Sequence, residues 1–446
     1  MVVNWIKRLF KAADHPFELV KISRDNHAIS RRSISPNALK VLYRLNKAGH
    51  EAYLVGGCVR DLQLDLAPKD FDVATDATPE QIRKLFGNSR IIGRRFRIVH
   101  VTFGREIIEV TTFRGKADDT HSDQKQSAEG MLLRDNVYGS LEDDAKRRDF
   151  TINAMYYTVE DFTVRAYPAG MQDLDEKMIR IIGDAETRYR EDPVRMLRAV
   201  RFAAKLNFNI EQTTANPIRE MAPLLTHIAP ARLFDEILKL LMSGKGVDTW
   251  KLLREYELIE PLFPQTHAAS TSVEDPYYSR FIEFGLRNTD KRINADKPVT
   301  PAFLYAALLW PAVREQAKHN IDMGSPEMPA WHKAMAQVLD RQVKTIAIPK
   351  RFSIPMKEIW EMQLRLPKRN ANRAEQILGH PRFRASYDFL LLREEAGEQL
   401  NELGQWWTDY QIKNPEQRRS MIDNLKSAND QKRRRRRAPR KRKPSV

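Results

Sequence analysis

The sequence has 446 residues, of which 42% are hydrophobic and 30% are charged. This hydrophobic fraction excludes a wholly disordered chain, and the length predicts about two to four domains. Lysine and arginine outnumber aspartate and glutamate by 75 to 59, so the formal net charge is +16 and favours a polyanionic partner, such as nucleic acid or a membrane surface, over a small neutral substrate alone.

The chain has a single cysteine, Cys58. One cysteine excludes a disulfide framework and a cysteine-based zinc site, and it indicates a reducing, cytoplasmic location. No apolar run approaches the ~20 residues of a membrane-spanning helix. The first fifteen residues lack the apolar core of a signal peptide, although Trp5, Ile6, Leu9 and Phe10 share one helical face. We expect a docked or frayed helix there, with peripheral membrane contact as the alternative.

After an N-terminal extension (1–34), residues 35–185 show alternating helical and strand patterns. Residues 37–48 have the apolar spacing of a helix. Two alternating segments flank Gly104 and Arg105, as the strands of a hairpin would. Short strands are expected at 51–55, 71–73, 97–103, 107–113, 163–167 and 178–182. These patterns predict an α+β domain with a small mixed sheet, which we term the head.

Beyond about residue 191 the strand alternation disappears, and apolar residues recur at i, i+3 and i+4. This spacing predicts an all-helical neck (186–245) and an all-helical body (246–425). The polar segment 115–130 is expected to be a mobile loop. Residues 432–443 contain ten lysines and arginines, and 426–446 are expected to form a basic disordered tail.

Two carboxylates stand two residues apart in the segment 69–73. If this segment is a strand, Asp70 and Asp72 project to one side while Phe71 faces the opposite layer. Carboxylates this close repel each other unless a cation lies between them, and Mg²⁺ prefers oxygen ligands of this kind. Alone, Asp-x-Asp is typical of surface loops, so its meaning depends on the residues around it.

A glycine turn precedes this pair. A short strand runs into Gly56 and Gly57, and a helix follows with Arg60 and Asp61 in its first turn. Glycines let backbone N–H groups approach a phosphate, and a helix N-terminus favours negative charge. The Walker lysine and Rossmann glycine motifs are absent, which argues against those sites. Beside the two aspartates, the turn is more typical of a phosphate site than of an ordinary loop.

The combination resembles the class II nucleotidyltransferases, the superfamily of tRNA CCA-adding enzymes and bacterial poly(A) polymerases. The resemblance covers residues 50–205, with the motifs in the family's order. They are Gly56-Gly57-x-x-Arg60-Asp61, Asp70-x-Asp72, Arg147-Arg148-Asp149-Phe150-Thr151-x-Asn153 and Glu191-Asp192-x-x-Arg195. The resemblance implies that residues 35–185 are a nucleotidyltransferase catalytic head.

The resemblance also implies a reaction in which an RNA 3′-hydroxyl attacks the α-phosphate of a nucleotide triphosphate and pyrophosphate leaves. Asp70 and Asp72 are expected to ligate two Mg²⁺ ions, and a third carboxylate is expected to complete the site. Glu109, in the neighbouring strand, and Asp149 are the two candidates. We favour Glu109 as metal neighbour or base and Asp149 as an essential acid near the nucleotide, and the reverse assignment stays open.

The remaining motif residues are carried over as nucleotide-binding. Asp192 and Arg195, three apart on one predicted helix face, are expected to read the Watson–Crick edge of the incoming base. Without the resemblance, a capped helix with a local salt bridge would explain them. The other nucleotide-binding candidates are Gly56, Gly57, Arg60, Asp61, Arg148 and Asn153.

Basic residues beyond the head are expected to hold the RNA. Cations beside aromatic surfaces, as in 348–373 with Phe352 and Trp360, suit single-stranded RNA, although a solvated helix face over a core tryptophan explains them equally well. The basic tail should add salt-dependent affinity. The candidate RNA contacts are Arg198, Arg201, Lys350, Arg351, Arg365, Arg369, Arg434 and Arg435.

Within the superfamily, residues 131–157 and the basic tail look like the bacterial poly(A) polymerase version. The resemblance therefore implies template-independent addition of AMP from ATP to RNA 3′ ends. Such tails expose RNA to decay, so RNA decay proteins are candidate partners. CCA addition to tRNA is the alternative, and an inactive RNA-binding protein is a third hypothesis that the intact set of acidic residues disfavours. Cys58, where the family usually has a small residue, should be tolerated in the turn.

Overall fold

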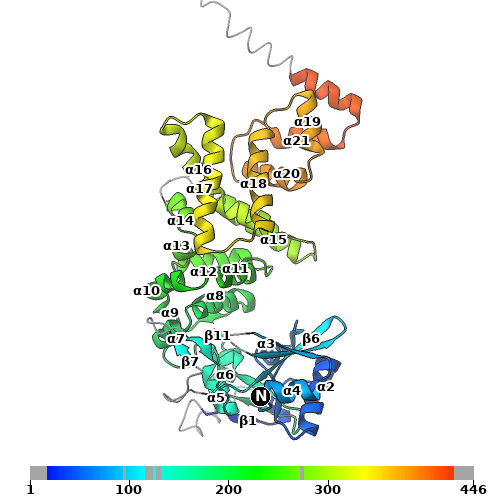
Figure 1. Cartoon of the computed structure of the whole chain (residues 1–446), viewed down its shortest axis with the longest axis vertical. Coiled ribbons are helices and arrows are strands. Elements are labelled where there is room, and N and C mark those ends of the chain that lie inside the picture. The colour runs from blue at the N-terminus through cyan, green and yellow to red at the C-terminus, as the bar shows by residue number, and fades with distance from the viewer. Residues whose placement is uncertain are drawn as a thin grey trace, which may run out of the picture. The chain divides into compact units, whose positions relative to one another are not determined.

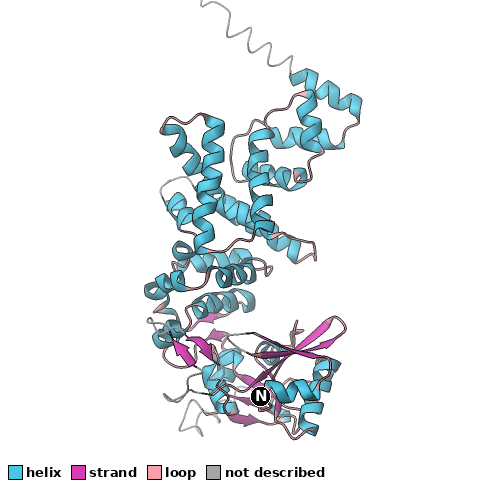
Figure 2. Ribbon diagram, viewed as in Figure 1, coloured by secondary structure: helices cyan, strands magenta, loops and turns pink. Residues whose placement is uncertain are grey.

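The structure is a computed structural model that describes residues 18–93, 97–115, 124–126, 132–135, 137–271 and 276–425. The chain divides into two compact units (Figure 1). Of the described residues, unit 1 comprises those up to Ile228 together with Glu255–Leu258, and unit 2 comprises Ala229–Arg254 and those from Ile259 onward. The described strands all lie in unit 1, and the regular structure described in unit 2 is helical (Figure 2).

Unit 1 is built on an eight-stranded mixed sheet with the order β1-β10-β9-β2-β3-β6-β5-β4. Neighbouring strands are antiparallel except for β3 and β6, which run parallel. The strands are β1 (Val20–Ile22), β2 (Ala52–Val55), β3 (Asp72–Thr75), β4 (Ser89–Ile92), β5 (Ile98–Phe103), β6 (Glu106–Thr112), β9 (Met155–Tyr157) and β10 (Val164–Ala166).

One face of this sheet is covered by α2 (Pro36–Lys47) and α4 (Pro79–Leu85), which also contact each other (Figure 1). Ser35 caps α2, and Thr78 with Gln81 forms a capping box on α4. The strand residues that alternate toward the apolar interior here include Val73, Val99 and Val110, each with no exposed surface. Because side chains alternate along a strand, the residues next to them face the other side of the sheet.

The opposite face carries a second apolar cluster, which includes Tyr53, Ala74 and Tyr156. Helix α5 (Leu141–Arg147) packs its Leu141 and Ala145 into this cluster. A capping box of Ser140 and Asp143 fixes the start of α5, so the segment that follows its last residue leaves the helix at Arg148. Near the strands lie α3 (Gly57–Gln63), the 3₁₀ turn η3 (Thr151–Asn153) and α6 (Pro168–Asp175).

Two small sheets and a group of helices complete unit 1. They are β7 (Gln124–Gln126) paired with β8 (Leu132–Asp135), β11 (Met178–Ile179) paired with β12 (Asn209–Ile210), η1 (Arg24–Asn26), η2 (Arg31–Ser33), α7 (Ala185–Glu191), α8 (Val194–Leu206), α9 (Gln212–Ala215), α10 (Ile218–Met221) and η4 (Ala222–His227).

Unit 2 has an all-helical order. Its helices are α11 (Pro230–Leu241), α12 (Gly246–Glu255, whose last residue belongs to unit 1), α13 (Ile259–Leu262), α14 (Pro264–Thr271), α15 (Tyr277–Ile293), α16 (Pro301–Asp322), α17 (Glu327–Thr345), α18 (Lys350–Arg365), α19 (Ala371–Leu378), α20 (Phe383–Glu395) and α21 (Leu403–Ile412). Buried aromatic residues such as Trp310, Trp360 and Trp407 form its interior.

The α+β class, with a mixed sheet followed by helices, is confirmed. The sheet begins earlier than residue 35, because β1 at Val20–Ile22 pairs with β10. Within the segment expected to be a loop, Gln124–Gln126 pairs with β8. The neck contains the short strand β12, and the division between the units falls inside it, so a separate neck and body remain a prediction. The N-terminal apolar face and the tail lie outside the described residues.

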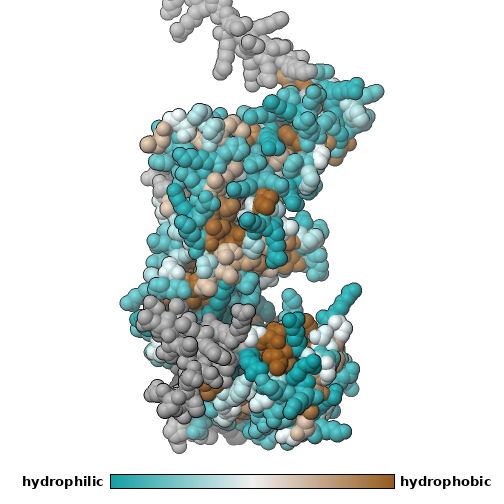
Figure 3. Space-filling model, viewed as in Figure 1, coloured by the Kyte–Doolittle hydropathy of each residue, from teal (hydrophilic) through white to brown (hydrophobic). Residues whose placement is uncertain are grey.

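The surface view in Figure 3 shows a mainly hydrophilic face with small hydrophobic patches. Exposed large hydrophobic residues come from separate places in the chain, for example Leu66, Met323 and Ile412. In the described part of the chain, no helix is both long enough and apolar enough to cross a membrane.

Candidate active site

Two carboxylates lie directly opposite each other in the central strands of the sheet. Asp72 of β3 pairs in register with Glu109 of β6, so both side chains lie on the face away from α2 and α4. Burial, together with the smaller effects of the negative charges of Glu109 and Asp70, raises the pKa of Asp72 to about 6, against the lowering effect of Arg148. The two strands therefore bring two carboxylates together on one face of the sheet.

Asp70 is not part of the strand. Strand β3 begins at Asp72, so Asp70 lies in the exposed turn before it, and the prediction that Asp70 and Asp72 project from one strand was wrong. Asp70 is nevertheless near enough for its charge to raise the pKa of Asp72. The cluster thus joins one residue from a turn with two from neighbouring strands.

Within the described residues, no group of three or more His, Cys, Asp or Glu side chains is arranged to hold a metal ion. The oxygen donors of Asp70 and Asp72 still fit a hard divalent cation that takes its other ligands from water and substrate phosphates.

The glycine turn lies between β2 and α3. Gly56 has a φ of 75°, a conformation that favours glycine, and its N–H donates to the carbonyl of Met155. A Cβ at Gly56 would lie 3.4 Å from Nη1 of Arg148, which puts this guanidinium against the turn. Cys58 is buried with its thiol donating to the carbonyl of Val55, and burial raises the pKa of the thiol to about 12.

Arg60 and Asp61 do not face solvent. Arg60 is 1% exposed, and its guanidinium donates to Oδ1 of Asp61 at 2.5 and 2.8 Å and to Oδ1 of Asn153 at 2.7 Å. Lys205 lies 3.6 Å from the other carboxylate oxygen of Asp61. Both residues were expected to contact the nucleotide; in the structure Asp61 accepts from Arg60, and Arg60 donates to Asn153.

Arg148 is fixed by residues that the sequence analysis did not single out. Its Nε donates to the Tyr156 hydroxyl at 2.7 Å and to Asp144 Oδ2 at 3.1 Å, and Nη2 donates to the same carboxylate oxygen at 2.9 Å. Burial works against its charge, but Tyr156 and Asp144 together raise the pKa of Arg148 above its ordinary value. The guanidinium is therefore a fixed cation beside the glycine turn.

Asp149 is occupied by other partners. Its Oδ2 accepts from Nε and Nη2 of Arg198 at 2.6 and 2.5 Å, and its Oδ1 accepts from the N–H of Phe150 and the amide of Asn153. Burial would raise the pKa of Asp149, but Arg198, Asn153 and the Phe150 N–H lower it to about 2. Of the two candidate third carboxylates, Glu109 is the one in register with Asp72.

The Glu191–Arg195 segment differs from the predicted helix opening. Glu191 ends α7, Asp192 has extended backbone, and α8 begins at Val194. The reason is Pro193, which disfavours helical backbone at the residue before it. Asp192 and Arg195 are therefore not on one helix face.

Arg195 forms an ion pair with Glu191, in which Nη1 and Oε2 lie 2.8 Å apart. Nη1 of Arg195 also donates to the carbonyl of Arg188, and Arg188 in turn binds Glu191 and the carbonyls of Arg147 and Arg148. This chain of contacts connects the predicted base-reading arginine to the motif that carries Arg148.

Two of the expected RNA contacts in α8 have partners inside unit 1. Arg198 binds Asp149, and the guanidinium of Arg201 lies 4.7 Å from the ring centroid of Phe202. Arg60 and Arg198 also lie against this ring, at 5.1 and 5.4 Å. The structure gives this basic face an internal packing role beside its expected role toward RNA.

The candidate RNA contacts of unit 2 lie at both ends of α18. Lys350 and Arg351 are exposed at its start, Arg365 is exposed near its end and pairs with Glu361, and Arg369 lies 5.2 Å from the ring centroid of Trp406. Trp360 is fully buried and its Nε1 donates to Ala306, so it is a core residue and not a stacking surface. Arg434 and Arg435 fall outside the described residues.

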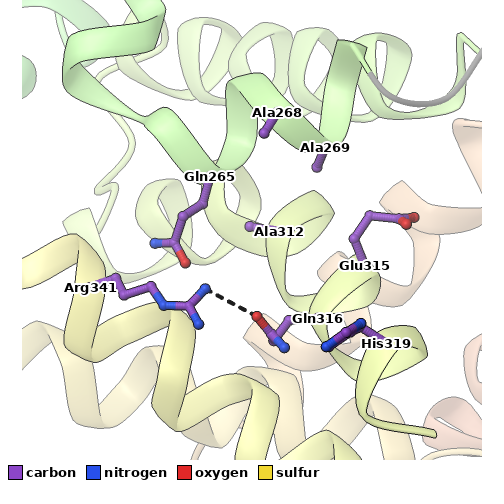
Figure 4. A pocket seen from close by; sticks show the side chains of 8 residues that line it. All are labelled: Gln265, Ala268, Ala269, Ala312, Glu315, Gln316, His319 and Arg341. Atoms are coloured by element: carbon purple, nitrogen blue, oxygen red, sulfur yellow. Dashed lines mark hydrogen bonds between the residues drawn. The ribbon is translucent and has the colours of Figure 1, made fainter. Parts of the chain in front are cut away.

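A cavity of about 340 Å³ lies in unit 2, between α14, α16 and α17 (Figure 4). It has a floor of small side chains and a polar rim in which Arg341 donates to Gln316. None of the residues predicted from the sequence lines it. Its lining residues are Gln265, Ala268, Ala269, Ala312, Glu315, Gln316, His319 and Arg341.

Three family models match the chain. "Poly A polymerase head domain" matches residues 52–180, "Probable RNA and SrmB- binding site of polymerase A" matches 207–270, and "Polymerase A arginine-rich C-terminus" matches 323–442. Together they cover the head, the helices that follow it and the basic C-terminal region.

Among curated relatives, the poly(A) polymerase I of Salmonella typhimurium is 54% identical over 429 residues, covering 95% of this chain and 92% of the relative. The CCA-adding enzyme of Bacillus subtilis is 38% identical over 245 residues, which is 54% of this chain and 60% of the relative. A solved structure of the Bacillus stearothermophilus CCA-adding enzyme in complex with CTP matches with a TM-score of 0.55 and 26% identity, covering 88% of this chain and 84% of that chain. The chain thus belongs to the poly(A) polymerase I family, and it is a polynucleotide adenylyltransferase.

Proposed function

We propose that this enzyme transfers AMP from ATP to RNA 3′ ends at the carboxylate cluster of Asp70, Asp72 and Glu109. The observation that carries the proposal is the register pair of Asp72 and Glu109, in which burial first, and then the charge of Glu109, raises the pKa of Asp72. An acidic cluster beside a glycine turn is the arrangement that a metal-bound triphosphate requires.

Asp70 and Asp72 would hold Mg²⁺ through their carboxylate oxygens, with Glu109 beside them. When bound, two Mg²⁺ ions lower the pKa of the attacking hydroxyl and neutralise charge on the entering and leaving oxygens. The chain's own residues supply the setting: an exposed Asp70, a half-buried Asp72, and a third carboxylate within the same sheet face. Asp149, held by Arg198, would act on structure near the nucleotide and not on the cation.

Arg148 would bind the triphosphate. Its guanidinium lies against the Gly56 turn and is held by Tyr156 and Asp144, so no side-chain freedom is lost when an anion binds. The proposed triphosphate site is supported by three buried residues, Asn153, Arg60 and Asp61. Gly57 begins helix α3 next to the glycine turn. We propose these residues as nucleotide-binding directly or through Asn153.

Asp192 and Arg195 would select the base without a template. Arg195 is held by Glu191 and by the carbonyl of Arg188, while Asp192 lies half-buried in the break between α7 and α8. A fixed guanidinium and a carboxylate offer donors and an acceptor to the edge of adenine.

The RNA primer would bind to basic residues of α8, α18 and the tail. These contacts are phosphate contacts, so affinity should fall with salt and show little sequence preference. A cytoplasmic location and association with RNA decay proteins are part of the same proposal, since tailed RNA is a substrate for decay.

The alternative function is CCA addition to tRNA, which uses CTP as well as ATP. The choice of nucleotide and of primer therefore distinguishes the two functions. Purified protein should be given a single-stranded RNA primer or a tRNA lacking its 3′ end, with ATP, CTP or both. We expect long tails on the RNA primer with ATP alone. Three added nucleotides on the tRNA, with both CTP and ATP required, would contradict the proposal.

A further inference from the structure

A histidine continues the row that Asp72 and Glu109 begin. In the antiparallel pair of β5 and β6, His100 lies directly opposite Glu109, and Glu109 lies directly opposite Asp72 in the parallel pair of β3 and β6. Residues paired in register across adjacent strands point to the same face of the sheet. Asp72, Glu109 and His100 therefore stand side by side on three consecutive strands, on the face away from α2 and α4.

The imidazole contacts the carboxylate. Nε2 of His100 lies 3.2 Å from Oε1 of Glu109. An ionised carboxylate can only accept a hydrogen bond, so the ring nitrogen carries the hydrogen and donates it. The side chain of His100 is 24% exposed and that of Glu109 is 47% exposed, so the donor is the better covered and the better fixed of the two.

Glu109 needs a partner to stay where it is. It lies beside Asp72, whose pKa its negative charge raises, and like charges this close push each other apart. A half-exposed glutamate has rotamers that turn it away into solvent, and ordering a long side chain costs conformational entropy. A donor on the far side of Glu109 from Asp72 opposes this movement. His100 occupies that position.

We propose that His100 is a positioning residue for nucleotidyl transfer, which holds the Glu109 carboxylate in the row with Asp72 through the Nε2–Oε1 hydrogen bond. The proposal rests on the proposed role of the carboxylate cluster. It depends on the donor hydrogen, which the neutral and the protonated imidazole both provide, and not on a change of charge. The competing explanation is a surface pair without functional effect, which is common for half-exposed ion pairs.

The first test compares two substitutions with a matched control. His100→Leu removes the donor and keeps the volume, His100→Gln keeps an N–H donor of similar reach, and Thr102→Val changes an exposed residue on the same strand and face, opposite Ile107. We expect His100→Leu to lower kcat about tenfold, with KM for ATP, primer affinity and Tm near those of the wild type. His100→Gln should recover most of the kcat. A His100→Leu enzyme with the kcat of Thr102→Val would overturn the proposal.

The second test asks whether His100 acts through Glu109. In a Glu109→Gln background, His100→Leu should change kcat less than about twofold, because the carboxylate it holds is already gone. If the loss of kcat in the double variant equals the product of the losses in the two single variants, His100 acts independently of Glu109, and this result would contradict the proposal. Should His100→Leu fail to fold, His100→Gln and the shorter His100→Asn decide the matter: a higher kcat for glutamine supports the proposal, and equal kcat values overturn it.

Asp72→Ala separates this inference from the proposed function on which it rests. If the Asp72→Ala enzyme still carries out nucleotidyl transfer, the proposed carboxylate mechanism is wrong. An inactive Asp72→Ala enzyme beside a fully active His100→Leu enzyme would remove only the role of His100.

Discussion

Arg198 of α8 and Asp149 of the segment after α5 form a close ion pair, with Nη2 and Oδ2 2.5 Å apart. The two residues are far apart in sequence, and the pair attaches helix α8 to the motif that carries Arg148. Asn153 and the N–H of Phe150 occupy the second oxygen of the same carboxylate. Asp149 therefore connects the segment after α5 to α8, the helix that carries both Arg195 and Arg198.

The Arg198–Asp149 ion pair predicts that the stability of the protein depends on pH. The folded pKa of Asp149 is about 2, below its ordinary value of 3.8, so its stabilising effect is full above pH ~4 and is lost as the pH falls toward 2. We expect Asp149→Asn to lower the free energy of unfolding by about 2 kcal/mol at pH 7. The difference from the wild type should shrink as the pH falls below 4. Urea unfolding followed by circular dichroism at pH 7, 4 and 3 measures it, with Asp65→Asn at an exposed turn as the control. A difference that does not change with pH would contradict the assignment.

The Glu191–Arg195 pair predicts an effect on the nucleotide. Glu191→Gln removes the charge that holds both Arg188 and Arg195, so Arg195 should lose its fixed position. We expect KM for ATP to rise about tenfold, with primer affinity unchanged. Steady-state kinetics with varied ATP provides the measurement, and Glu186→Gln, exposed on the same helix, is the control. Equal KM values for the two variants would show that Glu191 does not position Arg195.

The glycine turn predicts a steric effect. Alanine at position 56 must adopt a φ of 75° and place its Cβ 3.4 Å from Nη1 of Arg148. We expect Gly56→Ala to lose about 1–2 kcal/mol of stability and to bind ATP more weakly, because Arg148 shifts. Gly87→Ala, where a Cβ meets nothing within 4 Å, is the control for thermal unfolding and for ATP titration. Wild-type ATP affinity in Gly56→Ala would argue against a triphosphate seat at this turn.

The exposed start of α18 predicts a salt effect. The double substitution Lys350→Ala and Arg351→Ala should remove two phosphate contacts. The affinity for single-stranded RNA should then fall less steeply with salt, and the slope of log affinity against log salt should become less negative by about 1.4. Filter binding or fluorescence anisotropy at several salt concentrations gives this slope. The paired control is Lys333→Ala with Lys344→Ala, both exposed on α17. Identical slopes for the two double variants would show that Lys350 and Arg351 of α18 do not contact RNA phosphates.

The position of Glu109 beside Asp72 could be predicted from the sequence, whereas its role stays a prediction. Alternation placed Glu109 on one face of a strand, and the parallel pairing with β3 then brought it opposite Asp72. The same logic missed His100, which lies one strand further on: its partner could be named only once the register of β5 and β6 was known.

Helix periodicity was less reliable at the break after α7. The i, i+3 spacing of Asp192 and Arg195 indicated a shared helix face, but Pro193 interrupts the helix between them. The residue that binds Arg195 is Glu191, four positions earlier, from the preceding helix. A proline inside the motif was the available signal.

The partners of Arg148 could not be read from the sequence. Tyr156 comes from β9 and Asp144 from α5, and their meeting depends on how the helix packs on the sheet. Trp360 shows the same limit for unit 2, since its spacing suited a core position and an RNA surface equally, and packing decided for the core.

We propose that nucleotidyl transfer depends on the carboxylates of the sheet, and above all on Asp72. The most direct measurement is extension of an RNA primer with ATP by Asp72→Asn and by the wild type, with RNA affinity measured on the same preparations. We expect Asp72→Asn to lose at least about 10³-fold in kcat, with RNA affinity and Tm unchanged. Extension by Asp72→Asn at the wild-type rate would contradict it.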